Sequence, residues 1–516
     1  MDEEALEKEK EFLKDKVFPE KAILWHLTND FFDQIKDKKI IICQSPTGTG
    51  KSVILPYKLL YKKENDKFIF DRVFVSEPRQ IAAEEPAKTV MNYKHNKLFP
   101  GEKRIREIGF VHGGCALKKE SQKPLCKNPD ADLLYITEGS LINMIKKSDF
   151  DTNKSYCFII DEAHEKNTEM EELLIYFKYL MNKEKWNDNN KIIILSATMP
   201  VEWITCTDND NNTKQGIDVE FGNFSKKFTK TIITRNNPIK EFFDKDTVYI
   251  DFKLSTTKPI TEYYSLKPIK NYIATALELA KRAYENNEKV LIFVSGNGQI
   301  DKMEEYIRKK QNNEWSGINV YYVSSRQDDW KEEKGHTNKR NQIINNQKGI
   351  IISTPILETS VTIHHLTTVI DTGSSRQSIY IPELDLFTLP ESDISELNRM
   401  QRRGRVGRKT PGKVYYLYTE DTKNSLRKES FSKLTVSDIT KEVLKYKKNN
   451  ELFKLFIKSK ICKKMDVSIK KSIEKLQSYN LLDQKENITN LGLDVLDKLE
   501  NTRLKLEYIC LLYYSI

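Results

Sequence analysis

Residues 45–52 read Ser45-Pro46-Thr47-Gly48-Thr49-Gly50-Lys51-Ser52 and follow the apolar run Lys39–Cys43. A helical pattern comes next, so the order is strand, glycine loop and helix, which is the context of a phosphate-binding P-loop. The glycines let backbone N–H groups approach phosphate oxygens, and the N-terminus of the helix adds partial positive charge. The usual first glycine of the pattern is Ser45 here. A flexible glycine turn before a helix is the alternative, but Lys-Ser after the second glycine favours phosphate binding.

We therefore expect this loop to bind the phosphates of a nucleotide. The candidate binding residues are Thr47, Gly48, Thr49, Gly50, Lys51 and Ser52. The Lys51 amine can reach the β- and γ-phosphates, and the Ser52 hydroxyl can ligate Mg²⁺. ATP and Mg²⁺ are the expected cofactors, although no motif that reads the nucleotide base is visible.

Short apolar runs recur along the chain, each followed by a polar loop and a helical pattern. One set is Lys39–Cys43, Arg72–Val75, Leu133–Ile136, Tyr156–Ile160 and Lys191–Leu195, and a second is Val290–Val294, Val320–Val323, Gly349–Ile352, Thr368–Ile370 and Val414–Leu417. Nearly continuous apolar runs are typical of strands buried on both faces. Their alternation with helices predicts an α/β fold with doubly wound parallel sheets.

Two sets of strands predict two sheets, and a chain of 516 residues is too long for one hydrophobic core. Periodicity lapses at Phe252–Pro259, where we place the boundary between the first two domains. The polar stretch Cys206–Gly216 is expected to be a surface loop. After Glu420 the strand pattern stops and lysine-rich helical patterns follow.

A pair of carboxylates follows one of the predicted strands. The run Tyr156–Ile160 ends in Asp161-Glu162-Ala163-His164. This is the end of a buried strand where α/β sheets place their chemistry. Asp161 would hold Mg²⁺, and Glu162 would orient and deprotonate the attacking water. Alternatively, Asp161 could serve only as the N-cap of the next helix.

With further motifs in order, the chain resembles a superfamily 2 helicase of the DEAH-box type. The additional motif segments are Val75–Ala83, Tyr135–Gly139, Leu195–Thr198, Ile292–Gly296, Ser353–Ile363 and Gln401–Arg408. The resemblance implies two tandem RecA-like domains, 1–256 and 257–422. It also implies a small, mainly helical, winged-helix-like domain at 423–516.

The last of these motifs is identified as motif six of that family. The resemblance implies that Arg405 and Arg408 are arginine fingers and that Gln401 lies near the attacking water. The spacing of these three residues places them on one face of a helix. A basic helix that faces solvent or nucleic acid is the alternative. The form of motif six with arginine at position 403 resembles that of flavivirus and poxvirus helicases more than that of cellular splicing ATPases.

The resemblance places the arginine fingers in the second domain and Lys51 in the first. ATP would therefore be hydrolysed only when both domains close on it.

The resemblance also places contacts with the nucleic-acid backbone. The candidate residues are Arg79, Thr137, Ser295 and Thr354. Such contacts position a strand without reading its sequence, and an ordinary cap or turn is the alternative for each.

One segment between the motif segments Ser353–Ile363 and Gln401–Arg408 has the pattern of a hairpin. Within Ser378–Pro390, two apolar runs flank Glu383–Asp385. Related helicases place a strand-separating hairpin here, and Tyr380 or Phe387 could stack on a base. Alternatively, this hairpin only packs on the third domain.

The composition of the chain narrows the kinds of binding partner and the cellular compartment that we expect. The net charge is +10, and from Asp421 onward there are 20 Lys and Arg residues against 13 Asp and Glu, so a phosphate-facing surface in this region is plausible. No run approaches the roughly 20 apolar residues that span a bilayer, so no membrane contact is expected. The seven cysteines lack C-x-x-C spacing, which argues against a zinc site and favours reduced thiols in a cytosol-like compartment. We expect a cytoplasmic protein (host cytoplasm or virion if viral), with the nucleus left open.

The sequence therefore predicts an NTP-dependent nucleic-acid helicase. Its expected substrate is a single-stranded or tailed nucleic acid, RNA in preference to DNA, and the resemblance implies 3′-to-5′ movement. No residue of the sequence indicates a contact with the ribose 2′-OH, the group that distinguishes RNA from DNA. A monomer is expected, with a protein partner or activator possible. One alternative is a translocase that acts on DNA or remodels nucleoprotein complexes without separating strands. Another is a non-catalytic binding module, and the residues that argue against it are Lys51, Glu162, Arg405 and Arg408.

Overall fold

The computed structural model describes residues 31–45, 50–92, 102, 104–113, 128–147, 151–199, 213–221, 224–233, 238–245, 247–254, 258–310, 314–324, 342–358, 363–407, 410–428, 432–458, 465–502 and 504–515. The chain forms two compact units. Unit 1 contains Met1–Leu254, Tyr380–Leu386 and Phe431–Ile516, and unit 2 contains Ser255–Ile379 and Phe387–Ser430.

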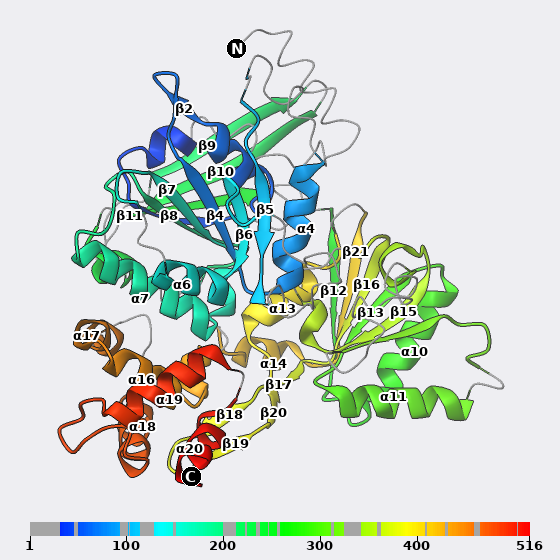
Figure 1. Ribbon diagram of the computed structural model, residues 1–516. Coiled ribbons are helices and arrows are strands. Elements are labelled where there is room, and N and C mark those ends of the chain that lie inside the picture. The colour runs from blue at the N-terminus through cyan, green and yellow to red at the C-terminus, as the bar shows by residue number, and fades with distance from the viewer. Residues whose placement is uncertain are drawn as a thin grey trace, which may run out of the picture. The chain divides into compact units, whose positions relative to one another are not determined.

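A nine-stranded sheet forms the centre of unit 1 within the described residues (Figure 1). Its order is β5-β6-β4-β7-β8-β1-β11-β10-β9. The strands are β1 (Ile40–Gln44), β4 (Arg72–Glu77), β5 (Ile108–Val111), β6 (Leu133–Thr137), β7 (Tyr156–Ile160), β8 (Lys191–Ser196), β9 (Thr213–Phe221), β10 (Phe224–Ile233) and β11 (Thr247–Leu254). All pairs are parallel from β5 to β11, whereas β10 pairs antiparallel with both β11 and β9.

Helices cover both faces of this sheet, and the alternation of side chains along each strand explains why. Ile40 and Ile42 of β1 share a core with helices α6 (Glu138–Lys147), α7 (Thr168–Asn182) and α9 (Pro238–Phe243). Ile41 and Cys43, which point to the other face, share a core with α3 (Ile54–Tyr61) and α4 (Gln80–Met91). A strand that is buried on both sides needs apolar residues at every position, which is the pattern by which its sequence was identified. A short hairpin of β2 (Lys63–Glu64) and β3 (Lys67–Phe68) follows α3.

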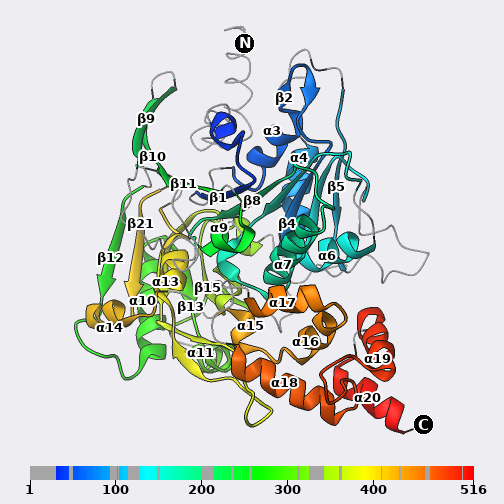
Figure 2. The ribbon, with the colours of Figure 1, turned by 90° about the vertical axis from the view of Figure 1, so that its left-hand side faces the viewer.

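The C-terminal part of unit 1 is helical (Figure 2). Its helices are α15 (Lys433–Val436), α16 (Thr440–Lys447), α17 (Asn450–Lys458), α18 (Asp466–Ser478), α19 (Asn490–Asn501) and α20 (Leu506–Tyr514). Their apolar residues continue the core that lies over α6 and α7. An isolated antiparallel bridge between Leu482 and Ile488 lies between α18 and α19.

A six-stranded sheet forms the centre of unit 2 within the described residues. Its order is β12-β21-β16-β13-β15-β14, and every pair is parallel. The strands are β12 (Ile260–Tyr264), β13 (Lys289–Phe293), β14 (Val320–Val323), β15 (Gly349–Ser353), β16 (Leu366–Asp371) and β21 (Gly412–Tyr416). Helices α10 (Tyr272–Glu285) and α11 (Asn297–Lys310) pack on one face. Helices α13 (Glu396–Arg403) and α14 (Glu420–Ser425) come later in the chain.

Two small hairpins precede α13. Strand β17 (Ser374–Arg376) pairs with β20 (Glu391–Asp393), and β18 (Ile379–Ile381) pairs with β19 (Leu386–Thr388). The predicted hairpin around Glu383–Asp385 is therefore confirmed.

The predicted strands of both sheets are confirmed to within one or two residues at each end. The predicted loop at Cys206–Gly216 was partly wrong. Residues 200–212 lie outside the described residues, but 213–216 begin β9, because this polar stretch pairs as an antiparallel edge. The division into domains 1–256, 257–422 and 423–516 stays a prediction.

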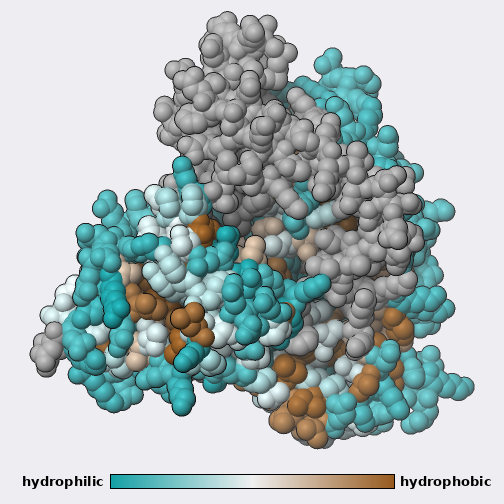
Figure 3. All heavy atoms as spheres, turned by 180° about the vertical axis from the view of Figure 1, so that it is seen from behind, coloured by the Kyte–Doolittle hydropathy of each residue, from teal (hydrophilic) through white to brown (hydrophobic). Residues whose placement is uncertain are grey.

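On the face that Figure 3 shows, the described residues are mainly hydrophilic, with local hydrophobic clusters. Several apolar side chains of α20 are more than half exposed, namely Tyr508, Leu511, Leu512 and Tyr514. Among the helices that the structure describes, none has the length and apolar character to cross a bilayer.

Candidate active site

The described end of the glycine loop requires a glycine at position 50. Gly50 has φ +91°, and a Cβ there would lie 2.6 Å from Cγ1 of Ile54. Its carbonyl oxygen accepts hydrogen bonds from the backbone N–H groups of Ile54 at 2.7 Å and of Leu55 at 3.1 Å, which begins α3. Only glycine adopts this backbone conformation without strain. The predicted residues Thr47, Gly48 and Thr49 lie outside the described residues.

Lys51 meets the acid pair of β7, as the sequence predicts for a phosphate site. Its Nζ lies 3.3 Å from Oε2 of Glu162 and 3.7 Å from Oδ1 of Asp161. The Ser52 hydroxyl donates a hydrogen bond to Oδ2 of Asp161. Lys51 and Asp161 are buried. Burial disfavours the charged amine, but Glu162 and Asp161 outweigh it, so the pKa of Lys51 is raised and the side chain stays a cation.

The acid pair is held in an unusual backbone conformation. Glu162 has φ +53°, in the left-handed region that non-glycine residues rarely adopt. Its backbone N–H donates to Oδ1 of Asp161 at 2.8 Å. A turn of this kind costs about 1–3 kcal/mol and is typical of functional sites. Burial and Glu162 raise the pKa of Asp161, with Lys51 opposing them.

His164 connects the acid pair to the end of β8. Its Nδ1 lies 2.9 Å from Oγ of Ser196 and 3.3 Å from Oε2 of Glu162. Ser196 in turn donates to the carbonyl oxygen of Thr198 at 2.7 Å. Burial lowers the pKa of His164, so the ring is neutral. In the tautomer that is protonated at Nδ1, the ring can donate a hydrogen bond to one of these two oxygens. The Leu195–Thr198 motif is thereby tied to Glu162.

The structure also brings residues to the site that sequence reasoning missed. Glu77 ends β4, beside β7, and is buried. Burial, followed by Asp161 and Glu162, raises the pKa of Glu77 well above its ordinary value. Tyr135 donates from its hydroxyl to the carbonyl oxygen of Ser52 at 2.9 Å. Both residues lie in motif segments named from the sequence, and a further signal for Glu77 was its position at the end of a buried strand, as for Asp161.

Two of the predicted nucleic-acid residues lie in unit 1, at the ends of neighbouring parallel strands. Arg79 follows β4 and pairs with Glu165 at 3.1 Å while remaining 39% exposed. Thr137 ends β6, and its hydroxyl lies 2.9 Å from that of Ser140. Because β4 and β6 are adjacent and parallel, these residues share one edge of the sheet.

The other two lie in unit 2. Ser295 follows β13 and is buried. Thr354 follows β15 and precedes a short 3₁₀ turn, without a side-chain capping bond. The predicted stacking residues of the hairpin differ in exposure. Tyr380 is buried and donates to Asp385 at 2.6 Å, so it presents no open ring face, whereas Phe387 is 57% exposed.

The motif-six helix α13 begins with a capping box formed by Ser395 and Asn398. Arg402 is fully buried and donates to Oε1 of Glu358 at 2.7 Å and to Oδ1 of Asp371 at 2.6 Å. Gln401 is partly buried, and its Nε2 has no hydrogen-bond partner among the described residues. The predicted helix face that joins residues 401, 405 and 408 was wrong.

The helix is too short for that face because it ends at Arg403. Gly404 is its C-cap and Gly407 has φ +72°, so the chain turns away from the helix axis. Arg405 lies in this turn, is buried, and donates to the carbonyl oxygen of Glu358. Arg408 lies outside the described residues.

The buried pairing of Arg402 supports a stability prediction. Arg402→Met should lower the free energy of unfolding by about 3–5 kcal/mol, because it leaves the Glu358 and Asp371 carboxylates buried without their partner. Urea unfolding of the full chain measures this loss. The control is Arg376→Met, which removes a 3.4 Å pair with Glu391 in which the Arg376 side chain is 41% exposed, and it should cost less than about 1 kcal/mol. Equal losses for the two variants would contradict the prediction.

Comparisons with known proteins agree with this arrangement. Residues 27–205 match the DEAD/DEAH box helicase family, and residues 271–410 match the helicase conserved C-terminal domain. The chain is similar to the probable ATP-dependent RNA helicase spindle-E of Aedes aegypti, with 26% identity over 76% of this chain and 27% of that protein. It is also similar to the ATP-dependent RNA helicase HrpA of Borreliella burgdorferi, with 26% identity over 78% of this chain and 41% of that protein.

A putative ATP-dependent RNA helicase of Acanthamoeba polyphaga mimivirus is 25% identical over 80% of this chain and 51% of its own length. The solved structure of the DExH-box NTPase HrpB of E. coli superposes with a TM-score of 0.66 at 19% identity, covering 95% of this chain and 52% of that one. This likeness shows the shared fold of tandem RecA-like domains. The chain spans about half or less of the length of these relatives.

Proposed function

The chain belongs to the DEAH-box helicases of superfamily 2, and on this premise we propose that it is an ATP-dependent helicase that acts on RNA. The observation that carries the proposal is the convergence of Lys51, Ser52, Asp161 and Glu162 at the ends of β1 and β7. These four side chains provide the charge and the oxygen ligands that phosphoryl transfer from a nucleotide requires. RNA is favoured because similar proteins are named RNA helicases.

Magnesium fits the donor set next to the loop. The Ser52 hydroxyl and the Asp161 carboxylate are hydrogen-bonded neighbours, and oxygen ligands are those that Mg²⁺ prefers. In the described part of the chain, no group of three or more His, Cys, Asp or Glu side chains forms a metal site. Two protein oxygens suit an ion that is shared with nucleotide phosphates. When bound, the ion would neutralise charge on the phosphate oxygens.

The residues of this chain would divide the reaction between them. Lys51 binds the β- and γ-phosphates. Glu162 orients a water molecule and accepts its proton while the water oxygen bonds to the γ-phosphorus, and the bond from that phosphorus to the bridging oxygen of ADP breaks. Arg405, and Arg408 with it, supply the positive charge that offsets the charge of the transition state.

Replacing Lys51 by alanine tests the phosphate site. Lys51→Ala should abolish measurable ATP turnover and weaken ATP binding while retaining RNA binding, because only the phosphate ligand is removed. Phosphate release with and without RNA, together with RNA affinity by fluorescence anisotropy, measures both effects. The control is Lys67→Ala, since Lys67 is an exposed lysine of β3. Wild-type turnover in Lys51→Ala would contradict the proposal.

The same assay distinguishes the remaining alternatives. ATP turnover is compared with RNA and with DNA of the same sequence, and unwinding is compared between a blunt and a 3′-tailed duplex. Stimulation by RNA and unwinding of the tailed duplex support the proposed helicase. Stimulation without strand separation indicates a translocase, and stimulation by DNA alone contradicts RNA as the substrate.

A further inference from the structure

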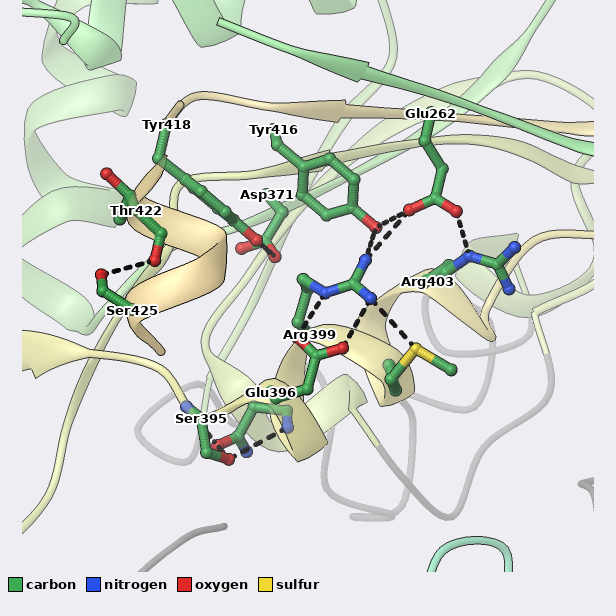
Figure 4. Close-up of polar contacts among 12 residues, drawn as sticks. Glu262, Asp371, Ser395, Glu396, Arg399, Arg403, Tyr416, Tyr418, Thr422 and Ser425 are labelled. Carbon is green, nitrogen blue, oxygen red and sulfur yellow. Dashed lines mark hydrogen bonds and ion pairs between the residues drawn. The ribbon is translucent and has the colours of Figure 1, made fainter. Parts of the chain in front are cut away.

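A single carboxylate on the edge strand of unit 2 receives hydrogen bonds from the motif-six helix (Figure 4). Glu262 of β12 accepts at Oε1 from Nε of Arg403 at 2.7 Å, and at Oε2 from an Nη atom of Arg399 at 3.0 Å. The Tyr416 hydroxyl of β21 donates to Oε2 at 2.8 Å. Both oxygens of Glu262 are therefore engaged. Glu262 lies outside the residues that match the two helicase families, 27–205 and 271–410.

The two arginines bind Glu262 from the same side of α13. They are four residues apart, so their side chains lie on successive turns of one face. Arg399 is buried, and it also forms a two-point contact with Glu396, at 2.7 Å for each nitrogen. Two positive and two negative charges balance within this cluster. Burial opposes the charge of Glu262, but hydrogen bonds from Arg403 and Tyr416 prevail and lower its pKa, so the carboxylate stays ionised.

A second carboxylate holds another side of the helix. Glu358 accepts from Nδ2 of Asn398 at 2.9 Å and from Nε of Arg402 at 2.7 Å. With one acidic side chain on each side, α13 can neither rotate about its axis nor slide along it without breaking charge-assisted hydrogen bonds. Such bonds are roughly twice as strong as neutral ones.

The fixed rotation determines where the candidate catalytic groups point. Each residue of an α-helix advances by about 100°, so Gln401 projects about 160–200° away from Arg399 and Arg403. The face that binds Glu262 is thus opposite the face that carries Gln401. Arg405 follows two residues after the last contact, in the turn that the helix enters. A change in the rotation of α13 would displace both groups.

We propose that Glu262 is a positioning residue for NTP hydrolysis: by holding Arg399 and Arg403, it orients α13 so that Gln401 and Arg405 are presented to the nucleotide. The inference rests on the proposed function of the chain. It assigns no contact between Glu262 and the nucleotide, so its effect is on turnover rather than on ATP binding.

The test is the Glu262→Gln variant of the full chain. We expect the kcat of RNA-stimulated ATP hydrolysis to fall about tenfold, with the KM for ATP within twofold of wild type and a thermal unfolding midpoint within a few degrees. An amide keeps the shape of the side chain but loses the charge that both arginines share. A residue with a purely structural role would lower the midpoint without this selective loss of kcat.

Arg403→Gln provides an independent measurement, because its side chain is 28% exposed and its loss disturbs no core. This variant should show the same kind of kcat loss, and it carries the test if Glu262→Gln does not fold. The double variant should lose no more kcat than the worse single variant, since both changes break one link. The matched control is Lys413→Gln, which removes a 2.6 Å pair between Lys413 of β21, the strand next to β12, and Glu288, and which should keep wild-type kcat.

The outcomes separate the inference from the function on which it rests. Wild-type kcat in both Glu262→Gln and Arg403→Gln would overturn the positioning role, as would losses that add in the double variant or a change confined to KM. A wild-type chain that hydrolyses no NTP would overturn the proposed function and, with it, this inference.

Discussion

Replacing Arg405 by alanine is expected to slow RNA-stimulated ATP hydrolysis by about three to five orders of magnitude. Charge builds on the γ-phosphoryl oxygens in the transition state, and an arginine finger that offsets this charge contributes about 10³–10⁵ in rate. ATP binding should change much less, because the contact strengthens only as the charge develops. Steady-state kinetics and the affinity for a non-hydrolysable ATP analogue measure the two effects.

A control on folding is needed because Arg405 is buried and donates to the carbonyl oxygen of Glu358. Arg405→Lys keeps the positive charge but lacks the planar fork of donors, so it should restore only a small part of the turnover. The thermal midpoints of both variants show whether the turn after α13 remains folded. Folded Arg405→Ala with more than a tenth of the wild-type turnover would exclude the finger role.

The Glu162→Gln variant should lose about two to four orders of magnitude in turnover, the usual contribution of a general base. The amide is the same size but cannot accept the proton of the attacking water. Lys51 and Asp161 remain in place, so ATP should still bind. Single-turnover hydrolysis and equilibrium ATP binding test the two parts separately.

Glu169→Gln is the matched control, since Glu169 is an exposed carboxylate in the first turn of α7. It should retain wild-type turnover. If Glu162→Gln hydrolyses ATP at more than a tenth of the wild-type rate while the fold is intact, another group takes the proton. Glu77, buried beside the same strand end, would then be the next residue to replace.

Local sequence was sufficient for most of the two parallel sheets. Strands such as β7 are buried on both faces, so continuous apolar residues mark them without any knowledge of their partners. The antiparallel pair β9 and β10 was missed because its residues, like Lys226 and Thr229, mix polar and apolar types. The end of α13 was misplaced because the helical spacing of arginines continues past Gly404, where the backbone turns.

The chemistry of the site was visible for the same local reason. Two short motifs each follow a strand: the glycine loop with Lys51 and Ser52, and the pair Asp161 and Glu162. Both can be recognised from the order and spacing of their residues alone. That these groups meet is a matter of sheet order: β1 and β7 both pair with β8, so their C-terminal ends lie at one edge.

Contacts between single residues far apart in the chain needed the folded structure. Glu262 lies 141 residues before Arg403. The sequence around each of these residues does not predict that they pair. In a strand of both polar and apolar residues, a single carboxylate has the same neighbours along the chain whether its side chain faces solvent or a buried arginine. Motif chemistry is therefore encoded by nearest neighbours along the chain, whereas the orientation of α13 arises from charges that meet only after the parallel strands have brought them into register.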